Sequence, residues 1–201
     1  MKYSLTDGSI DLIKKYQEYL INDNVSGFLY RIAPYDTLYV SQLFQYMYET
    51  IPNFLTYTDH IPRYAFWSDA FSDEGQGTEY STIIVPNNIQ TIDSNAFSKA
   101  IIHCVDLSHT NIKQLPSNCF LNSYVNKVYL PPQLEYIRDR AFANVRGLCQ
   151  LEIPATIKNI SAVAFLDIYS PLTIICPTDA IEKDLYEIKS LTGSYLNIIR
   201  K

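Results

Sequence analysis

Residues 128–142 read VYLPPQLEYIRDRAF and residues 151–165 read LEIPATIKNISAVAF, so one phrase returns after 23 positions. In both, a triplet with apolar ends precedes a proline, two apolar residues follow three positions apart, and an Ala-Phe pair closes the phrase. A period of roughly 20 to 29 residues is typical of a solenoid, in which each coil buries its apolar face against the next.

The same phase extends along much of the chain. A small residue followed by phenylalanine recurs at intervals of 31, 23, 22 and 23 positions, at Ala65-Phe66, Ala96-Phe97, Cys119-Phe120, Ala141-Phe142 and Ala164-Phe165. A second marker recurs every 22 or 23 positions, at Pro86, Ser108, Pro131, Pro154 and Pro177. The two markers together predict about five coils within residues 54–177.

The triplets before the second marker alternate with a period of two, at residues 83–85, 105–107, 128–130, 151–153 and 174–176. This alternation predicts short parallel strands, which proline ends because it lacks a backbone N–H donor. Beyond the proline, apolar pairs such as Leu134 and Ile137 lead the chain across the core. We expect the Ala-Phe pair on the opposite wall, in a helical turn.

Two stretches carry a family likeness: VPNNIQTIDSNAF at 85–97 and IPATIKNISAVAF at 153–165 resemble the BspA-like class of leucine-rich repeats. The likeness covers about residues 82–177, with a degenerate unit FLTYTDHIPRYAF at 54–66. It implies a curved solenoid whose parallel sheet faces a partner, in a family of mostly non-catalytic interaction or adhesion proteins, many of them at cell surfaces. We therefore predict an α/β solenoid of short parallel β-strands with an N-terminal helical cap and a C-terminal capping helix.

The ends of the array are predicted from helical spacing. Residues 1–53 form an aromatic-rich cap, with amphipathic helices expected at 9–20 and 36–50 and an extended piece at 28–32. Residues 178–201 form the second cap, with a helix at 178–190 that starts at Asp179 and Glu182 and a short extended segment after it. Such caps would cover the open strand edges and apolar surface of the terminal coils.

Composition limits the classes of function. The net charge of −5 disfavours a nucleic-acid backbone binder. Residues 1–25 hold no long apolar run and no segment approaches 18 apolar residues, so we expect no export signal and no membrane insertion. Four cysteines without a CxxC pair predict buried, reduced thiols. These features favour the cytoplasm, or the host cytoplasm for a phage-encoded protein.

The middle residue of each predicted strand points away from the core, so these residues form a column on the sheet face. The column contains Ile84, Asp106, Tyr129, Glu152 and Ile175, flanked by Thr82, Cys104, Lys127, Gln150 and Thr173. In solenoids such a face commonly binds a partner. Alternatively, the column residues only satisfy strand propensity.

The first interval between Ala-Phe pairs is lengthened by an acidic insertion at 67–80, WSDAFSDEGQGTEY. Trp67, Asp73 and Glu74 are candidate partner contacts, because loops on a firm scaffold often carry function. The carboxylates lack the ligand spacing of a calcium loop. A solvated linker is the alternative.

Other site types find little support. His103, Cys104, His109 and Cys119 lack paired zinc-ligand spacing, and Cys119 occupies a core Ala position. The basic group Lys127, Arg138, Arg140 and Arg146 fits a solvated face better than a phosphate site. With no nucleophile, phosphate-loop or metalloprotease motif, the sequence predicts no catalytic residue, no metal and no cofactor.

We therefore predict a non-enzymatic protein-interaction module that binds a protein through the sheet face. Steric occupancy by an inhibitor or adaptor from a phage or pathogen is the simplest mode of action. Two alternatives stay open. One is a cell-surface or virion adhesin, as the family resemblance implies, and the other is an enzyme with its site where the N-terminal helices meet the first coil.

Overall fold

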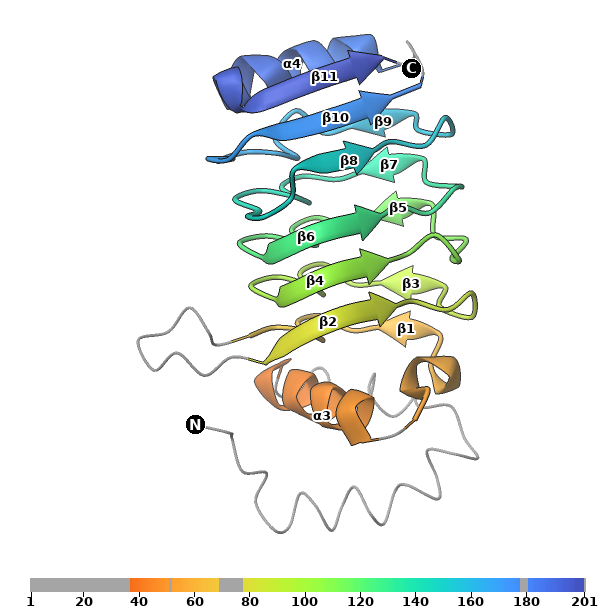
Figure 1. Ribbon diagram of the computed structural model, residues 1–201. Coiled ribbons are helices and arrows are strands. Elements are labelled where there is room, and N and C mark those ends of the chain that lie inside the picture. Colours follow the sequence, from red (N-terminus) through yellow and green to blue (C-terminus); the bar gives the residue numbers. More distant parts are fainter. Residues whose placement is uncertain (1–36, 51, 69–77, 178–180, 201) are drawn as a thin grey trace.

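The computed structural model of the protein describes residues 37–50, 52–68, 78–177 and 181–200 (Figure 1). The helix expected at 9–20, the extended piece at 28–32, the start of a helix at Asp179, and Asp73 and Glu74 of the insertion lie outside the described residues.

Parallel strands form one wall of a stack of coils (Figure 1). They are β2 (Glu79–Ile84), β4 (Ile101–Asp106), β6 (Tyr124–Tyr129), β8 (Gln150–Glu152), β10 (Leu172–Cys176) and β11 (Leu196–Arg200). β2, β4 and β6 form one sheet, and β8, β10 and β11 form another. Short parallel strands were predicted and are present, and the expected final extended segment is β11.

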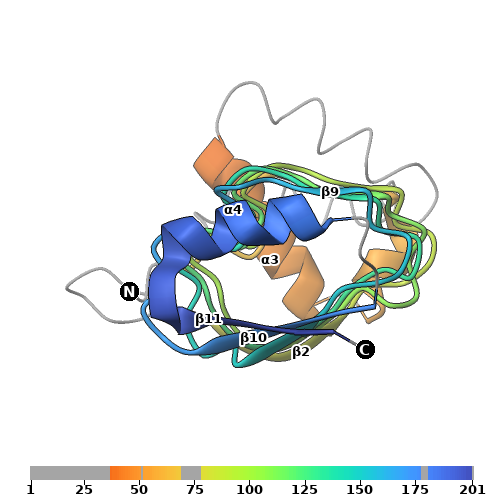
Figure 2. The same cartoon turned by 90° about the horizontal axis from the view of Figure 1, so that it is seen from above.

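A second wall consists of two-residue strands where the apolar pairs cross the core. They are β1 (His60–Ile61), β3 (Thr91–Ile92), β5 (Gln114–Leu115), β7 (Tyr136–Ile137) and β9 (Asn159–Ile160). Their second residues are buried, and β1 pairs with β3 while β5, β7 and β9 pair in order. Viewed along the stacking axis, successive coils superpose and enclose a common interior (Figure 2).

Strands β2, β4 and β6 begin several residues before the predicted triplets. In β6, Val125 and Val128 are buried, and the exposed Asn126 and Lys127 lie side by side in the sequence between them. Two outward residues in succession break the period of two, so the alternation pattern did not predict the first half of each strand. The triplets correspond to the ends of the strands.

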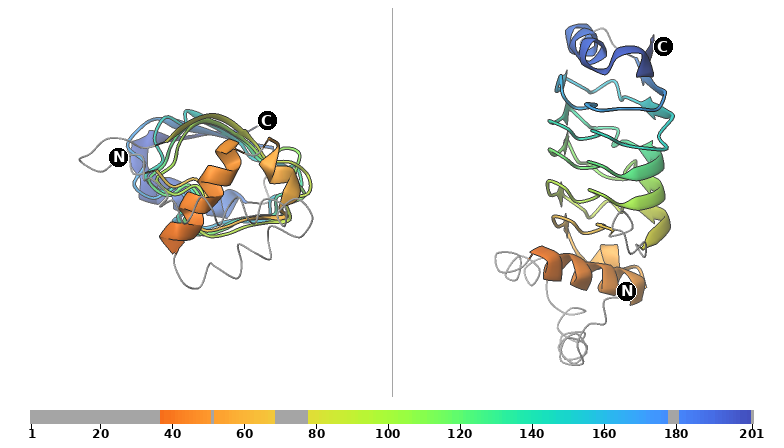
Figure 3. Two further views of the ribbon diagram at one scale, coloured as in Figure 1. Left: turned by 90° about the horizontal axis from the view of Figure 1, so that it is seen from below. Right: turned by 90° about the vertical axis from the view of Figure 1, so that its left-hand side faces the viewer.

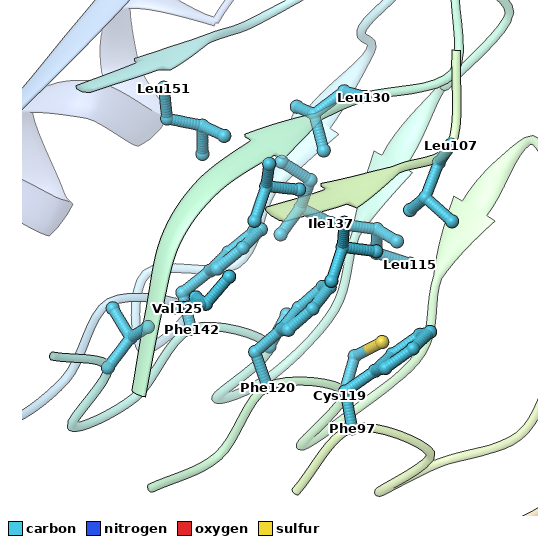
Figure 4. Close-up of a cluster of buried hydrophobic side chains, with 14 of the residues drawn as sticks. Phe97, Leu107, Leu115, Cys119, Phe120, Val125, Leu130, Ile137, Phe142 and Leu151 are labelled. Carbon is cyan, nitrogen blue, oxygen red and sulfur yellow. The ribbon is translucent and has the colours of Figure 1, made fainter. Parts of the chain in front are cut away.

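Five phenylalanines form a single file through the interior, as the spacing of the Ala-Phe pairs predicts. Neighbouring rings from Phe66 to Phe165 stack with centroids 5.0 to 5.3 Å apart and planes within 8° of parallel. All five are at most 1% exposed, and Figure 4 shows three of them beside the buried aliphatic side chains. Burial of each ring contributes about 2 to 3 kcal/mol to stability.

The helical turn expected at the Ala-Phe pair is wrong, because these segments are successive tight turns. Residues just before the pair, such as Asn118 (φ 60°), and two positions after it, such as Asn122 (φ 57°), have left-handed backbones that cannot continue a right-handed helix. The turns also join the coils, since Phe120 N–H donates to Ala141 O (2.7 Å) and Phe142 N–H donates to Ala164 O (2.8 Å).

Helices lie at both ends of the stack (Figure 3). Helix α3 (Thr37–Thr50) and the single turn η1 (Phe54–Tyr57) lie at one end, where the Phe44 ring meets the Phe54 and Phe66 rings edge-on at 5.2 and 5.5 Å. Helix α4 (Glu182–Thr192) and the turn η2 (Gly193–Tyr195) lie at the other. That these elements act as caps remains a prediction.

Helix α4 differs from its prediction in its bounds. Ile181 occupies the N-cap position without a side-chain capping bond, and the helix continues to Thr192. The Asp184 carboxylate accepts hydrogen bonds from Ile160 N–H and Asn159 Nδ2, both 2.9 Å long. These bonds connect α4 to β9, which explains why the helix lies against the last coil.

Candidate functional site

The predicted surface column is present in two parts. In the first sheet, Ile84 pairs with Asp106 and Asp106 pairs with Tyr129, so their side chains follow one line across β2, β4 and β6. In the second sheet, Glu152 pairs with Ile175. A parallel line contains the flanking residues Thr82, Cys104 and Lys127 in the first sheet and Gln150 and Thr173 in the second.

Apolar and aromatic groups are exposed on this face. Ile84 is 58% exposed and Tyr129 is 42% exposed. Lys127 Nζ lies 4.6 Å from the centroid of the Tyr129 ring. The Tyr129 side chain raises the pKa of Lys127, and the ammonium group makes a cation–π contact with the ring.

Two members of the column are less exposed, and so less accessible to a partner, than predicted. Asp106 is half-buried and its Oδ1 accepts hydrogen bonds from Ser108 N–H (2.9 Å) and Ser108 Oγ (2.6 Å). Asp106 therefore shapes the turn after β4. Ile175 is also half-buried, in a strand with a neighbour on each side.

Sequence reasoning missed two exposed residues of the face. Ile199 pairs with Ile175 and is 45% exposed, so it extends the line of the column. Tyr124, at the start of β6, is 42% exposed. Ile199 lies outside the repeat phrase, and Tyr124 lies before the predicted triplet. The only signal for either was an aromatic or β-branched residue in an extended segment.

The face is interrupted between β6 and β8. From Phe142 to Pro154 the chain has one residue more than from Phe120 to Pro131. The segment bends at Gly147, whose backbone is left-handed (φ 83°). A Cβ at this position would lie 3.2 Å from Val125 O, so a side chain there would crowd β6.

This interruption leaves a hollow in the face. It has a volume of about 650 Å³ and is lined by Ser108, by residues 126–130 at the end of β6, and by residues 149, 150 and 152–154 at and around β8. In other coils, the backbone N–H of the residue after the strand donates a hydrogen bond to the next coil. Examples are Leu107 N–H to Tyr129 O (2.9 Å) and Ile153 N–H to Ile175 O (2.8 Å). Among the described residues, Leu130 N–H makes no such bond to the next coil.

The opposite wall pairs its polar side chains with one another. Lys158 Nζ donates to Glu135 Oε2 (2.6 Å), and Arg138 Nε donates to Gln114 Oε1 (2.8 Å). The bond from Lys158 lowers the pKa of Glu135. These contacts join neighbouring coils, so this wall presents fewer free groups to a partner.

Asp93 and His60 make a similar contact at the first coils. His60 Nε2 lies 3.2 Å from Asp93 Oδ2. Burial raises the pKa of Asp93, but the hydrogen bond and charge of His60, together with Arg63, lower it by more, so the net direction is downward. The carboxylate therefore stays ionised and links β1 to the coil of β3.

Trp67 marks the start of the acidic insertion. Its side chain is half-buried, its carbonyl accepts a 2.6 Å hydrogen bond from Gln45 Nε2, and Lys99 Nζ lies 6.0 Å from its ring centroid. Trp67 is thus attached to α3 and the second coil. Its role as a partner contact remains a prediction.

The expectation of buried thiols is correct for only two cysteines. Cys119 and Cys176 are fully buried, and burial raises the pKa of Cys119 far above its usual range. Cys149, which directly precedes β8, is exposed, and Cys104, on the outward side of β4, is half-buried. All four are free thiols. Within the described part of the chain, no three His, Cys, Asp or Glu side chains gather as metal ligands.

The enzyme alternative required a cleft with a buried carboxylate where α3 meets the first coil. Phe44, Tyr48, Phe66 and Tyr80 fill this junction with edge-on ring contacts. Over the residues that can be described, none of the buried polar side chains is a carboxylate. None of the described helices is long and apolar enough to cross a bilayer.

The chain matches a known family. The model of a family described as "BspA type Leucine rich repeat region" matches residues 67–171 with six copies. This range includes every column residue except Ile175. A comparison with curated proteins finds no match.

Proposed function

The chain belongs to the BspA-type leucine-rich repeat family, and from this premise we propose that it is a protein-interaction module whose sheet face binds a protein partner. One observation carries the proposal: Ile84, Tyr124 and Tyr129 are exposed on a hydrogen-bonded parallel sheet, whereas the opposite wall pairs its polar groups with one another.

The exposed residues are suited to the centre of an interface. Tyrosine buries a large area with little loss of conformational entropy, and it is enriched among the residues that dominate binding energy. Lys127 above the Tyr129 ring adds a charge that can pair with a partner carboxylate at the rim. A partner with an apolar patch bordered by acidic groups fits this arrangement.

The hollow between β6 and β8 provides a place for a protruding partner side chain. The buried Leu130 and Ile153 are among its lining residues, and Tyr129 and Glu152 border it. An apolar side chain that enters it would leave water at about 25 cal/mol per Å² of buried area. The binding energy would therefore concentrate near Tyr129.

Occupancy of a partner surface is the proposed mode of action, as an inhibitor or as an adaptor that joins two proteins. Both need only a stable surface. The stacked phenylalanines and the turn-to-turn hydrogen bonds supply that stability without a cofactor.

The test replaces two exposed residues of the face with acids. The tagged protein and its Ile84→Asp/Tyr129→Glu variant are used to capture proteins from a lysate of the cells that produce the chain. We expect the variant to lose the partner, with affinity reduced at least about tenfold, because each position contributes about 1 to 2 kcal/mol.

The matched control is Leu191→Asp/Tyr186→Glu, which makes the same types of change at two exposed residues of helix α4, 51% and 71% exposed, outside the sheet. Thermal unfolding of both variants checks that neither change unfolds the protein. Undiminished capture by Ile84→Asp/Tyr129→Glu would show that the binding surface lies elsewhere.

A further inference from the structure

A second hollow lies at the α3 end of the stack, away from the sheet face. It has a volume of about 650 Å³ and is lined by residues 56–59 after η1 begins, residues 87–90 of the turn after β2, and Asn111 of the next coil. The BspA-type assignment starts at residue 67, so the η1 side of this hollow lies outside the matched repeats.

The lining is polar and almost neutral. It contains the amides of Asn87, Asn88, Gln90 and Asn111. Thr56, Tyr57 and Thr58 add hydroxyl groups, and Asp59 adds the one carboxylate. No lysine, arginine or histidine is among these described lining residues, so the hollow is not suited to a phosphate or another anion.

An apolar ligand is also disfavoured. Ile89 is the one aliphatic lining residue, and its side chain is only 1% exposed. Amides carry both donors and acceptors, and hydroxyl groups can do either. A ligand with several neutral hydroxyl groups matches this set.

Asn88 is held in place before any ligand arrives. Its Nδ2 donates to Leu55 O (2.8 Å) and to Thr58 O (2.5 Å), so its amide joins the turn after β2 to η1. Gln90 N–H donates to Asp59 O (2.7 Å), which fixes the same two segments. The Oδ1 of Asn88 therefore has a set orientation, and preorganised polar groups lose little entropy on binding.

An aromatic ring lies beside these polar groups. Tyr57 ends η1, lines the hollow and is 44% exposed. The face of a tyrosine ring is apolar while its hydroxyl group remains hydrated. A sugar ring has one face of C–H groups and an edge of hydroxyl groups, so it can contact Tyr57 and the amides together.

The amides are not a requirement of the repeat. At the positions of Asn87 and Asn88, the later coils have Pro132 and Gln133, then Ala155 and Thr156. At the position of Gln90, they have Glu135 and Lys158, which form an ion pair with each other. Stacking of the coils therefore does not need an amide cluster, and the cluster occurs at this end of the array.

We propose that this hollow is a binding site for a neutral saccharide, with Tyr57 as the stacking surface and Asn87, Asn88, Gln90 and Asn111 as hydrogen-bonding partners. The site is separate from the sheet face, and neither proposal depends on the other.

The test titrates the full chain, labelled with ¹⁵N, with neutral trisaccharides built from glucose, mannose, galactose and N-acetylglucosamine. We expect at least one to cause saturable shifts at the backbone amides of residues 87–90 and at Asn111, with a Kd of about 1 mM or tighter. Tyr57→Ala and Asn111→Ala should each weaken binding at least about fivefold.

Tyr169→Ala is the matched control, because it removes an exposed tyrosine elsewhere and should leave the Kd unchanged. Asn111→Ala keeps the test valid if Tyr57→Ala unfolds the chain. No saturable shift with any of the sugars would overturn the proposal, as would saturable shifts confined to other residues. Binding of inorganic phosphate in the same hollow would also overturn it.

Discussion

At the scale of single residues, the left-handed backbone of the turns suits some residue types and strains others. Asn95, Asn118 and Arg140 each precede an Ala-Phe or Cys-Phe pair and have φ values of 66°, 60° and 54°. Asparagine tolerates this left-handed region, because its short side chain can bond to the local backbone. Arginine has no such compensation, so Arg140 is strained.

Arg140→Asn should raise the free energy of unfolding by about 0.5 to 1 kcal/mol, since it removes this strain at an exposed position. Urea unfolding measures the change. Arg140→Gln is the control, because it removes the charge without the left-handed preference, and it should leave stability nearly unchanged. Equal gains from both variants would assign the effect to charge.

At the scale of elements, each coil is stable only beside its neighbours. The Phe142 ring stacks against Phe120 at 5.1 Å and against Phe165 at 5.3 Å, so a single side chain joins three coils. The Ala or Cys before each phenylalanine is small enough for the coils to approach. An isolated coil would expose this interior to water.

Phe142→Ala should lower the free energy of unfolding by roughly 3 to 5 kcal/mol, because it leaves a cavity in the middle of the stack. Chemical denaturation monitored by circular dichroism gives the difference. Tyr169→Ala, an exposed aromatic truncation, should change stability by less than about 0.5 kcal/mol. A loss below 1 kcal/mol for Phe142→Ala would contradict the interior file.

The repeated markers predicted the interior file and the line of the column residues because residues in phase occupy equivalent places in every coil. They did not predict the start of β6, because Asn126 and Lys127 point outward in succession. They also missed the interruption before β8, since the effect of one added residue depends on the bend at Gly147. Pairing of β11 with β10 lies outside the repeat and had no periodic signal.

At the scale of the whole molecule, the two walls are interrupted at different levels. The strand wall opens between β6 and β8 beyond the bridge of Tyr124 with Arg146, where β5, β7 and β9 remain paired on the other side. The second wall breaks between β3 and β5, where β2, β4 and β6 remain paired. From Ser108 to Ile112 the chain has one residue more than from Pro131 to Leu134, which accounts for the second break. Each break is therefore bridged by the opposite wall.

This arrangement keeps the stack continuous while the sheet face opens at one place. The phenylalanine file passes both breaks without a gap, from Phe66 to Phe165. The hollow beside Tyr129 can therefore exist without loss of the core. We expect partner contacts to concentrate there.

Site-specific photo-crosslinking tests the proposed face most directly. A benzophenone amino acid replaces Tyr129 in one variant and Tyr186 of helix α4 in another, and each variant is irradiated in a lysate of the producing cells. The account predicts a covalent product of the chain with a partner protein from position 129 and none from position 186. The absence of a product from position 129 would contradict it.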